Sequence, residues 1–346
     1  MTIGLSWYGL PQYAARLFRR TIELLGEPCV VVGSRPFVPV EGMDRVLGVP
    51  IHWVDGEQPV RWRDIGLDVP RIFVQSGWAY PSFSALGNEV KAAGGKVIGL
   101  SDANWRGDLR QLMLGPVAFR LKHRMHFDAM LVPGREGARL MRWFGIPAKR
   151  IRVGMYGADP ALFSGGPPLA MRSKTFLFVG QFIARKDVLG LADAFLEFAK
   201  DHPDWCLHLV GGGEQQDSIP LDPRIRVEAF VQPEELARRF HAARFFVLPS
   251  VFEAWGLVAH EAALSGCGLV LSDCVGSAED LCMPTNGVRF KAGRKDDLVR
   301  ALTKAAAFDE TRLTVAKAES RRLAAQFGPD RFALEVAALI NKLGEV

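Results

Sequence analysis

The sequence predicts an α/β fold with two doubly wound parallel-sheet domains. Three observations lead to this prediction. The chain has 346 residues, which is longer than the usual single domain. Short apolar runs alternate along it with amphipathic helical patterns, as expected for βαβ units whose sheets carry helices on both faces. A segment rich in glycine and proline, 164–168, interrupts the alternation near mid-chain, and we expect it to link the two domains.

Each half contains several strand and helix patterns. In the first half, the apolar runs predict strands at 3–6, 29–32, 72–75, 97–100, 129–132 and 151–153, with helices at 12–25, 82–93, 109–123 and 136–144. In the second half, the predicted strands are 176–179, 206–210, 225–228, 245–248, 268–272 and 288–290, with helices at 189–200, 233–241, 257–265 and 296–306 and in a long C-terminal stretch.

Composition excludes several classes of protein. Hydrophobic residues make up 49% and charged residues 23%, which is ordinary globular usage and argues against a disordered or coiled-coil chain. No stretch has the roughly 20 apolar residues of a membrane-spanning helix, and we expect no signal peptide. The five cysteines form no C-x-x-C pair. We therefore expect reduced thiols, no zinc site and a cytoplasmic location.

The charge is distributed unevenly between the halves. Residues 1–163 hold 21 Lys and Arg against 14 Asp and Glu, whereas residues 164–346 hold 22 against 24. A basic first half suggests an anionic partner, namely nucleic acid, an anionic membrane surface or a phosphorylated substrate. A solvated, arginine-rich surface is an equally good interpretation.

Several nucleotide-binding and catalytic motifs are missing. The glycines Gly211, Gly212 and Gly213 follow a strand, but Gln216 stands where G-x-G-x-x-G needs its last glycine. No P-loop and no G-x-S-x-G elbow occurs. No Asp-x-Asp pair is present, so a metal clamp on a diphosphate has no obvious ligands. We expect no metal and no cofactor.

The segment 245–270 is the richest in chemistry. A strand there leads into a loop with Glu253, and a helix that is apolar nearly all round opens near Gly256. Its first amides, near Trp255, offer an anion site. Glu261 lies on an apolar face of this helix. A buried carboxylate is costly without a partner, so we expect the protein or a ligand to supply one.

Two adjacent cations, Arg185 and Lys186, stand between a predicted strand and the next helix. Helix N-termini disfavour cations, so this pair is locally unfavourable unless an anion lies there. A solvated pair of loop residues is the alternative interpretation.

Four motifs in order now resemble a known family. A strand ending in Gly-x-x-x-x-Arg-Lys is followed by Val-Gly-Gly-Gly-Glu, then Pro-Ser-x-x-Glu-x-Trp-Gly-Leu, then Glu-Ala. This series resembles the family-4 retaining glycosyltransferases of the GT-B fold, and the spacing of Glu253 and Glu261 matches their E-x7-E signature. The resemblance covers most of 150–345 and is looser in 127–163.

The resemblance implies two Rossmann-like domains that face each other across a cleft. They would be an acceptor domain, 1–163, and a donor domain, 169–328, with a C-terminal helix at 329–346 that packs back onto the first. A nucleotide-sugar, which is a substrate and not a cofactor, would bind mainly the second domain. Arg185 and Lys186 would hold the diphosphate, Glu253 the donor sugar and Glu261 the ribose. Further donor contacts would come from Gly180, Gln181, Gly211, Gly212, Gly213, Val231, Trp255, Gly256, Leu257 and Val258.

Three positions depart from the family pattern. Many members have Arg where Gln181 stands, and Gly where Asp187 stands. The glycine-rich loop of the first domain is reduced to Gly9 and its neighbours. The chemistry nevertheless agrees with the residues, because a departing diphosphate gains charge that cations and helix amides stabilise.

The resemblance implies a metal-independent, retaining transfer in which the leaving phosphate takes the acceptor's proton. The acceptor would be a glycan or a lipid-linked molecule, in bacterial surface-polysaccharide assembly. A GT-B nucleotide-sugar epimerase and a non-catalytic nucleotide-sugar binding protein are the alternatives. Nucleic acid has no recognised module here.

Candidate acceptor contacts follow strands of the first half. They are Gly9, Ser76, Trp78, Asp102, Asn104 and Arg106. Each also fits plain turn or cap chemistry. The stretch 106–124 interleaves five cations and one acid with apolar residues. It fits an interfacial helix on anionic lipid and, equally, a solvated helix face.

Overall fold

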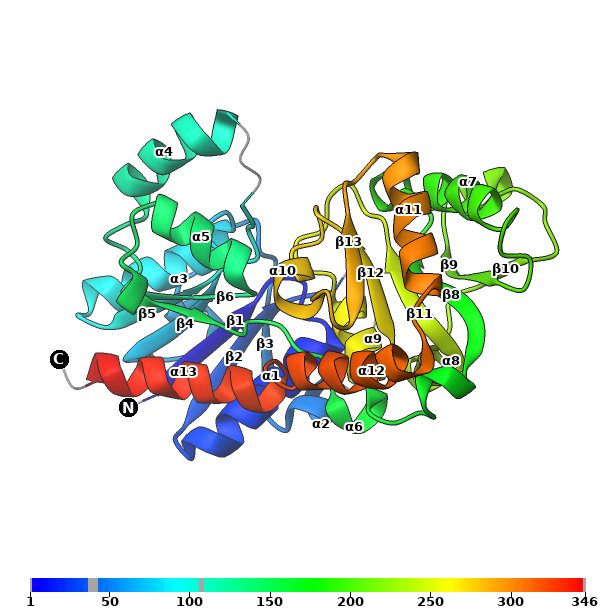
Figure 1. Ribbon diagram of the computed structural model, residues 1–346. Helices are drawn as coiled ribbons and strands as arrows, with labels where there is room; N and C mark the ends of the chain where they lie inside the picture. Colours follow the sequence, from blue (N-terminus) through cyan, green and yellow to red (C-terminus); the bar gives the residue numbers. More distant parts are fainter. Residues whose placement is uncertain (1, 37–42, 106–108, 345–346) are drawn as a thin grey trace. The chain divides into compact units, whose positions relative to one another are not determined.

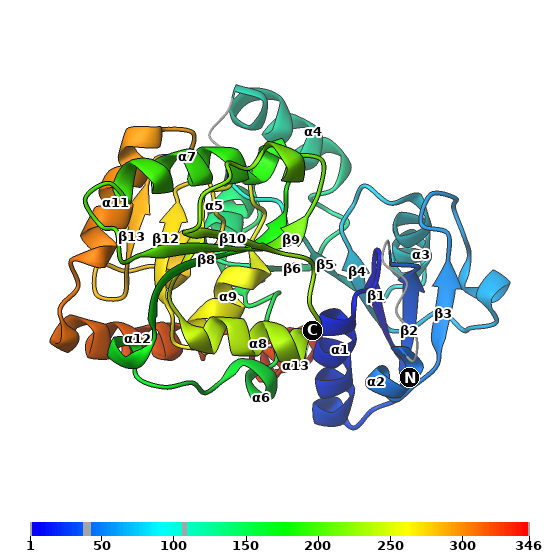
Figure 2. The ribbon, with the colours of Figure 1, turned by 90° about the vertical axis from the view of Figure 1, so that its right-hand side faces the viewer.

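The computed structural model describes residues 2–36, 43–105 and 109–344. The chain forms two compact units, residues 1–157 with 327–346 and residues 158–326. Each unit contains one sheet whose paired strands are all parallel, with helices packed on the sheet (Figures 1 and 2). The predicted class, two doubly wound α/β sheets, is confirmed.

The sheet of the first unit has seven strands in the order β3-β2-β1-β4-β5-β6-β7. The strands are β1 (Ile3–Trp7), β2 (Cys29–Ser34), β3 (Ile51–Val54), β4 (Ile72–Ser76), β5 (Lys96–Leu100), β6 (Ala129–Val132) and β7 (Ile151–Val153). Its helices are α1 (Gln12–Leu25), α2 (Met43–Leu47), α3 (Pro81–Ala92), α4 (Gly115–Lys122), α5 (Arg135–Trp143) and α13 (Pro329–Gly344). The sequence did not predict β3, because this short edge strand is only partly buried and lacks a continuous apolar run.

Side chains from the two faces of this sheet form separate cores. Ile72 and Val74 belong to one core, whereas Phe73 between them belongs to the other. This alternation follows from the two-residue period of a strand. Helix α13 closes the first core beside α1, where the rings of Phe18 and Phe332 lie 6.0 Å apart.

The sheet of the second unit has six strands in the order β10-β9-β8-β11-β12-β13. The strands are β8 (Ser173–Gln181), β9 (Cys206–Gly212), β10 (Ile225–Glu228), β11 (Ala243–Leu248), β12 (Gly268–Ser272) and β13 (Gly287–Phe290). Its helices are α6 (Pro160–Phe163), α7 (Val188–Phe198), α8 (Pro233–Ala242), α9 (Leu257–Leu264), α10 (Ala278–Leu281), α11 (Lys295–Ala306) and α12 (Glu310–Ala324).

The boundaries between the two units lie at other residues than the predicted ones. The first unit ends at Gly157 and not at 163, and the chain returns to it at Phe327 and not at 329. Gly157 and Gly328 touch backbone to backbone, since a Cβ on Gly157 would lie 2.1 Å from the Cα of Gly328. Only glycine allows such an approach, and no periodic pattern in the sequence reveals it.

The glycine- and proline-rich segment 164–168 lies inside the second unit and is not the linker that we expected. Lys317 on α12 donates to the carbonyls of Gly166, at 2.8 Å, and Pro167, at 2.9 Å. The guanidinium of buried Arg172 donates to Pro167 at 3.1 Å. Side-chain donors therefore take up the carbonyls of a segment whose sequence suggested a solvated connection.

The helix predicted over 109–123 consists of two parts. A π-helical turn, η2 (Arg110–Leu114), runs directly into α4. The cause is Pro116, whose ring would clash with the carbonyl of Leu112 in a regular α-helix. A wider π turn before the proline relieves this clash.

Candidate functional site

Strand order in the second sheet reverses between β8 and β11. The chain runs from β8 outward to β9 and β10, and then returns to β11 on the other side of β8. Because all these strands are parallel, their carboxyl ends lie along one edge of the sheet. Open α/β sheets bind ligands at the carboxyl edge, where the strand order reverses. The two most informative loops of the sequence follow β8 and β11.

The loop after β8 presents the two cations that the sequence singled out. Gly180 and Gln181 end the strand, and Arg185 and Lys186 form a short turn before α7. Asp187 follows with a φ of 52°, the left-handed region in which glycine is favoured and aspartate is tolerated. This conformation explains why glycine suits the position in the family that the sequence resembles.

Glu253 brings the two loops together. Its carboxylate forms an ion pair with the Lys186 ammonium, and Nη1 of Arg185 lies 3.5 Å from the same oxygen. The Lys186 and Glu253 side chains are 11% and 14% exposed, so water screens their pair only weakly. Val251 also donates its amide to the Arg185 carbonyl at 3.0 Å. The sequence predicted an anion for these cations but did not identify Glu253 as one.

The backbone around Glu253 is held from a third loop. Its amide donates to the Cys274 carbonyl at 3.1 Å, and its carbonyl accepts from the Gly276 amide at 3.0 Å. Gly256 then turns the chain into α9 with a φ of 83°. A Cβ on Gly256 would lie 3.2 Å from the Glu253 Cγ. The predicted helix opening at Gly256 is confirmed.

Helix α9 presents its N-terminus at this edge of the sheet. Leu257 and Val258 are its first residues, and amides in the first turn of a helix have no acceptor within it. Trp255, just before the helix, is buried. The predicted anion-binding end of the helix is thus close in sequence to the carboxylate that pairs with Lys186.

Glu261 lies in the middle of α9. The residue is half-buried, and its carboxylate has no hydrogen bond or ion pair with the residues that the structure describes. Burial raises the pKa of this carboxyl to about 8, so the neutral form predominates at pH 7. The described part of the protein therefore does not supply the partner that the sequence analysis expected for a charged Glu261.

The neighbouring His260 has a structural role. Its Nδ1 accepts from the Ala158 amide at 3.0 Å, and its Nε2 donates to the Ala324 carbonyl at 2.9 Å. Complete burial lowers its pKa to about 4, so the ring stays neutral at pH 7. The tautomer is set by these two backbone partners, which tie α9 to both ends of the second unit.

The glycines after β9 lie against the loop after β8. The Phe182 amide donates to the Gly212 carbonyl at 2.9 Å, and a Cβ on Gly213 would lie 2.6 Å from the Phe182 carbonyl. A Cβ on Gly211 would lie 1.9 Å from the Gly180 carbonyl. Close contact between backbones therefore requires glycine at Gly211 and Gly213, whether or not they also bind a nucleotide.

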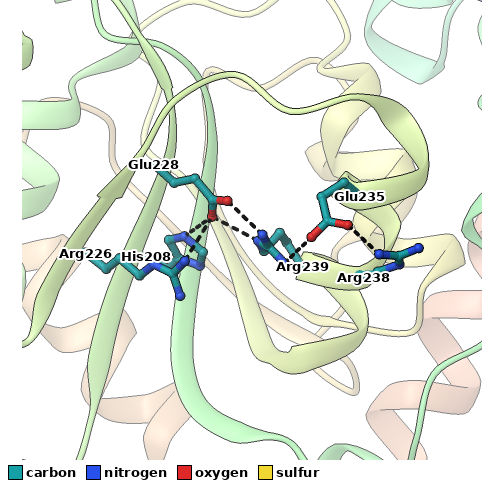
Figure 3. A network of polar contacts seen from close by, with 6 residues as sticks. All are labelled: His208, Arg226, Glu228, Glu235, Arg238 and Arg239. Carbon is teal, nitrogen blue, oxygen red and sulfur yellow. Dashed lines mark hydrogen bonds and ion pairs between the residues drawn. The ribbon is translucent and has the colours of Figure 1, made fainter.

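A polar network fixes the start of the loop that carries Val231. Glu228, the last residue of β10, accepts from Arg239 on α8 at 2.7 and 2.9 Å and lies 2.8 Å from Nε2 of His208 (Figure 3). These contacts, led by the hydrogen bonds from Arg239, lower the Glu228 pKa to about 2. Val231 lies between β10 and α8. Sequence reasoning did not find this network, because its members are far apart in the chain.

The acceptor candidates of the first unit lie in different environments. Strand order there reverses between β1 and β4, and Gly9 and Ser76 lie at the ends of these two strands. The Ser76 hydroxyl accepts from the Tyr8 amide at 3.0 Å, and Gly9 donates its amide to Ser34. The structure therefore brings Gly9 and Ser76 together at the reversal point.

The other candidates are more dispersed. Trp78 is half-buried and packs edge-on against the core residue Phe119, with ring centroids 5.0 Å apart. Asp102 is exposed after β5, and Asn104 is buried and accepts from Gln111 at 2.7 Å. Arg106 lies outside the described residues.

Sequence reasoning did not identify Tyr8, which forms an aromatic pair with Tyr80 at the same reversal point. The rings of Tyr8 and Tyr80 stack with centroids 3.7 Å apart. The Tyr8 hydroxyl donates to Glu57 at 3.1 Å. Stacked rings of this kind offer an apolar face with a polar edge, which suits a sugar or another ring. The signal for this pair in the sequence was Tyr8, which comes two residues after the predicted strand at 3–6.

The described residues contain no group of three or more His, Cys, Asp or Glu side chains that could hold a metal ion.

The second unit matches a known family by sequence. Residues 173–307 match the family model of the glycosyl transferases group 1, a span that contains Arg185, Lys186, Glu253 and Glu261. Glycogen synthase of Mycobacterium tuberculosis is 34% identical over 156 residues, which are 42% of this chain and 37% of that protein. D-inositol 3-phosphate glycosyltransferase of Corynebacterium kroppenstedtii is 27% identical over 214 residues, 54% and 48% of the two chains. The chain thus spans less than half the length of these relatives.

Solved structures share the fold of the whole chain. Sucrose-phosphate synthase from Thermosynechococcus elongatus has a TM-score of 0.70 at 17% identity, over 100% of this chain and 99% of that chain. HepE of Anabaena in complex with UDP-glucose has a TM-score of 0.74 at 14% identity, over 99% and 100%. The chain has the GT-B fold, and residues 173–307 of its second unit resemble the group 1 glycosyl transferases.

Replacement of Glu261 by glutamine should change how stability depends on pH. The Glu261 pKa is about 8 in the folded protein and near 4.3 in an unfolded chain, so the folded state binds more protons between these values. Wild-type stability therefore falls as pH rises through this window, by about 1.4 kcal/mol for each unit of pKa shift that is realised. Glu261→Gln should escape this loss and melt higher than the wild type at pH 8.

Thermal melts of both proteins from pH 5 to pH 9 test this expectation. Glu310→Gln, at an exposed glutamate in the first turn of α12, is the control and should shift stability by only a few tenths of a kcal/mol. Parallel profiles for the wild type and Glu261→Gln would contradict a raised pKa at Glu261.

Proposed function

We propose that the protein is a glycosyltransferase that moves a sugar from a nucleotide-sugar donor to a glycan or lipid-linked acceptor. One observation carries this proposal. Arg185, Lys186 and Glu253 meet where the strand order of the second sheet reverses, inside the span that matches the group 1 glycosyl transferases. Cations at such a point suit a ligand whose negative charge grows during the reaction.

Arg185 and Lys186 are the residues that we assign to the diphosphate. A diphosphate arriving at this edge competes with Glu253 for the Lys186 ammonium, and the carboxylate then accepts from donor-sugar hydroxyls. The first amides of α9, at Leu257 and Val258, add positive partial charge. Together these groups stabilise the departing nucleoside diphosphate without a metal ion.

Glu261 is the residue that we assign to the ribose. A ribose diol offers two donors, and an ionised carboxylate only accepts, so the two are complementary. We further assign the border of the base to Gly211, Gly212, Gly213 and Val231. Gly180, Gln181, Trp255 and Gly256 complete the donor side.

We infer a retaining, metal-independent reaction that needs no cofactor. In this scheme the acceptor approaches on the face from which the diphosphate leaves, and the leaving phosphate takes its proton. Glu253 is paired with two cations, which suits hydrogen bonding to hydroxyls better than nucleophilic attack. We assign the acceptor to the first unit, where the stacked Tyr8 and Tyr80 rings adjoin Gly9 and Ser76.

The proposed setting is bacterial surface-polysaccharide assembly in the cytoplasm, at the inner face of the membrane. UDP-sugars are the first donors to try, because a solved structure of the same fold, HepE of Anabaena, contains UDP-glucose. No described helix is long and apolar enough to cross a bilayer.

The direct test is incubation of the protein with UDP-, GDP- and ADP-sugars, with and without a glycan or lipid fraction as acceptor. We expect release of one nucleoside diphosphate and attachment of its sugar to the acceptor. Binding of a nucleotide-sugar without any transfer would overturn the proposal in favour of a binding protein. An interconverted sugar nucleotide would overturn it in favour of an epimerase.

Replacement of Lys186 by alanine should slow transfer sharply. Loss of one positive contact to the leaving diphosphate should lower kcat/KM by roughly 30- to 1,000-fold, as for the loss of one oxyanion donor. The control is Lys174→Ala, which removes an exposed lysine of β8 that pairs with Asp204. That variant should keep wild-type turnover. Wild-type turnover in a folded Lys186→Ala protein would contradict the assigned role.

Nucleotide binding should release a proton from Glu261. The free carboxyl is mainly neutral at pH 7, whereas the ribose diol favours its ionised form. Affinity for the matching nucleoside should therefore rise between pH 6.5 and pH 8.5. Isothermal titration at pH 7 in two buffers of different ionisation enthalpy measures the released protons.

We choose the nucleoside as the ligand because it has no phosphate groups. Titration of phosphate therefore does not contribute to the measured proton release. Glu261→Gln should bind more weakly by roughly 10-fold, equivalent to about 1.5 kcal/mol, and should release no proton. Equal proton release by the variant and the wild type would exclude Glu261 as its source.

A further inference from the structure

The segment 109–125 of the first unit, which contains η2 and α4, exposes an unusual number of large apolar side chains. Six of them are more than half exposed: Leu109 at 76%, Met113 at 67%, Leu114 at 69%, Val117 at 56%, Leu121 at 82% and Met125 at 85%. We call these six residues the apolar stripe. Single exposed apolar residues are common on proteins, but a contiguous group marks an interaction site.

The opposite face of the segment already packs onto the protein. Pro116 and Phe119 are buried, and the Phe119 ring lies 5.0 Å from those of Trp78 and Phe144. The segment is therefore apolar on both faces, although a surface helix normally turns polar residues toward water. Packing in the core explains the apolar residues on the face of Pro116 and Phe119, but it does not explain those of the exposed stripe.

The spacing of most of the stripe fits the π turn. Its members Leu109, Met113, Val117, Leu121 and Met125 recur every four residues. Four residues overshoot one turn of an α-helix and fall short of one turn of the wider π-helix. The π turn η2 therefore offsets the drift of α4, and this spacing predicts a common side of the helix axis for Leu109, Met113, Val117 and Leu121.

The charges beside the stripe are all positive. Residues 109–127 contain no Asp or Glu. Lys122 and Arg124 are exposed and make no ion pair with the described residues. Arg120 donates to the Trp143 carbonyl at 3.0 Å, which ties α4 to the end of α5. Trp143 itself is 42% exposed, with its ring nitrogen donating to the Gln111 carbonyl at 3.2 Å.

We propose that the apolar stripe inserts into the headgroup region of an anionic bilayer, with Lys122 and Arg124 against lipid phosphates. Apolar residues beside cations, with a tryptophan at their edge, are what an interfacial helix presents. The proposal does not rest on glycosyl transfer. It favours one of the two interpretations that the sequence left open for 106–124, of which residues 106–108 lie outside the described part.

A second copy of the chain fits this surface less well. A symmetric contact through the stripe would bring Lys122 and Arg124 of one copy near the same residues of the other. Like charges would then meet without any acid from this segment to offset them. An anionic lipid surface supplies the missing negative charge and an apolar layer together.

The test is co-sedimentation of the full chain with vesicles of phosphatidylcholine alone or with 30% phosphatidylglycerol, at low and at high salt. We expect binding to the anionic vesicles, weaker at high salt and at least 10-fold weaker with neutral vesicles. The stripe variant Val117→Gln/Leu121→Gln and the charge variant Lys122→Gln/Arg124→Gln should each lower the bound fraction at least 10-fold at low salt. All four residues are exposed, so both variants should keep the wild-type melting temperature.

Leu221→Gln is the matched control, since Leu221 is a fully exposed leucine of the second unit. It should bind vesicles as the wild type does. Equal binding to neutral and anionic vesicles, or full binding by the stripe variant, would overturn the proposal. A concentration-dependent dimer that Val117→Gln/Leu121→Gln abolishes would overturn it in favour of a second copy.

Discussion

The contact between Lys186 and Glu253 holds two loops together at the carboxyl edge of the second sheet. It joins the loops that follow β8 and β11, the two neighbouring strands at which the strand order reverses. Glu253 is in turn held by backbone bonds to the loop after β12. A charge pair with little exposure is costly unless its geometry is satisfied, so this pair fixes the positions of both loops. The same groups are then already in place for a charged ligand, which lowers the cost of ordering them on binding.

Unlike Glu253, Glu261 has no cation among the described residues to offset the cost of its charge. Burial raises its pKa to about 8, and no described residue offsets the cost of the charged form. Its neighbour His260 has both ring nitrogens bonded to backbone, which holds α9 in place, whereas Glu261 has no hydrogen-bond or ion-pair partner among the described residues. A group that costs stability in the free protein is typical of functional sites. The helix is therefore anchored to the backbone at His260, and the next residue, Glu261, has a raised pKa.

The uneven charge of the chain gains a structural interpretation. In the second unit, where acids slightly exceed bases, the cations at the carboxyl edge of the sheet are paired with Glu253. In the basic first unit, Lys122 and Arg124 stand beside exposed apolar residues and have no acidic partner in the described ranges. A positive charge that is neutralised within the fold and one that is left at the surface serve different ligands. We therefore assign the first to a diphosphate and the second to lipid.

The sequence by itself determined the parallel sheets, the opening of α9 at Gly256 and the order of the motifs. These features depend on local periods and local backbone preferences, which a sequence displays directly. Only the tertiary structure decided that Glu253 neutralises Lys186, that Trp78 packs against a core, and that Tyr8 stacks on Tyr80. It also moved the boundary of the first unit to Gly157, where contact with Gly328 leaves no room for a side chain. Each of these depends on contacts between residues far apart in the chain, for which no local pattern in one sequence gives a signal.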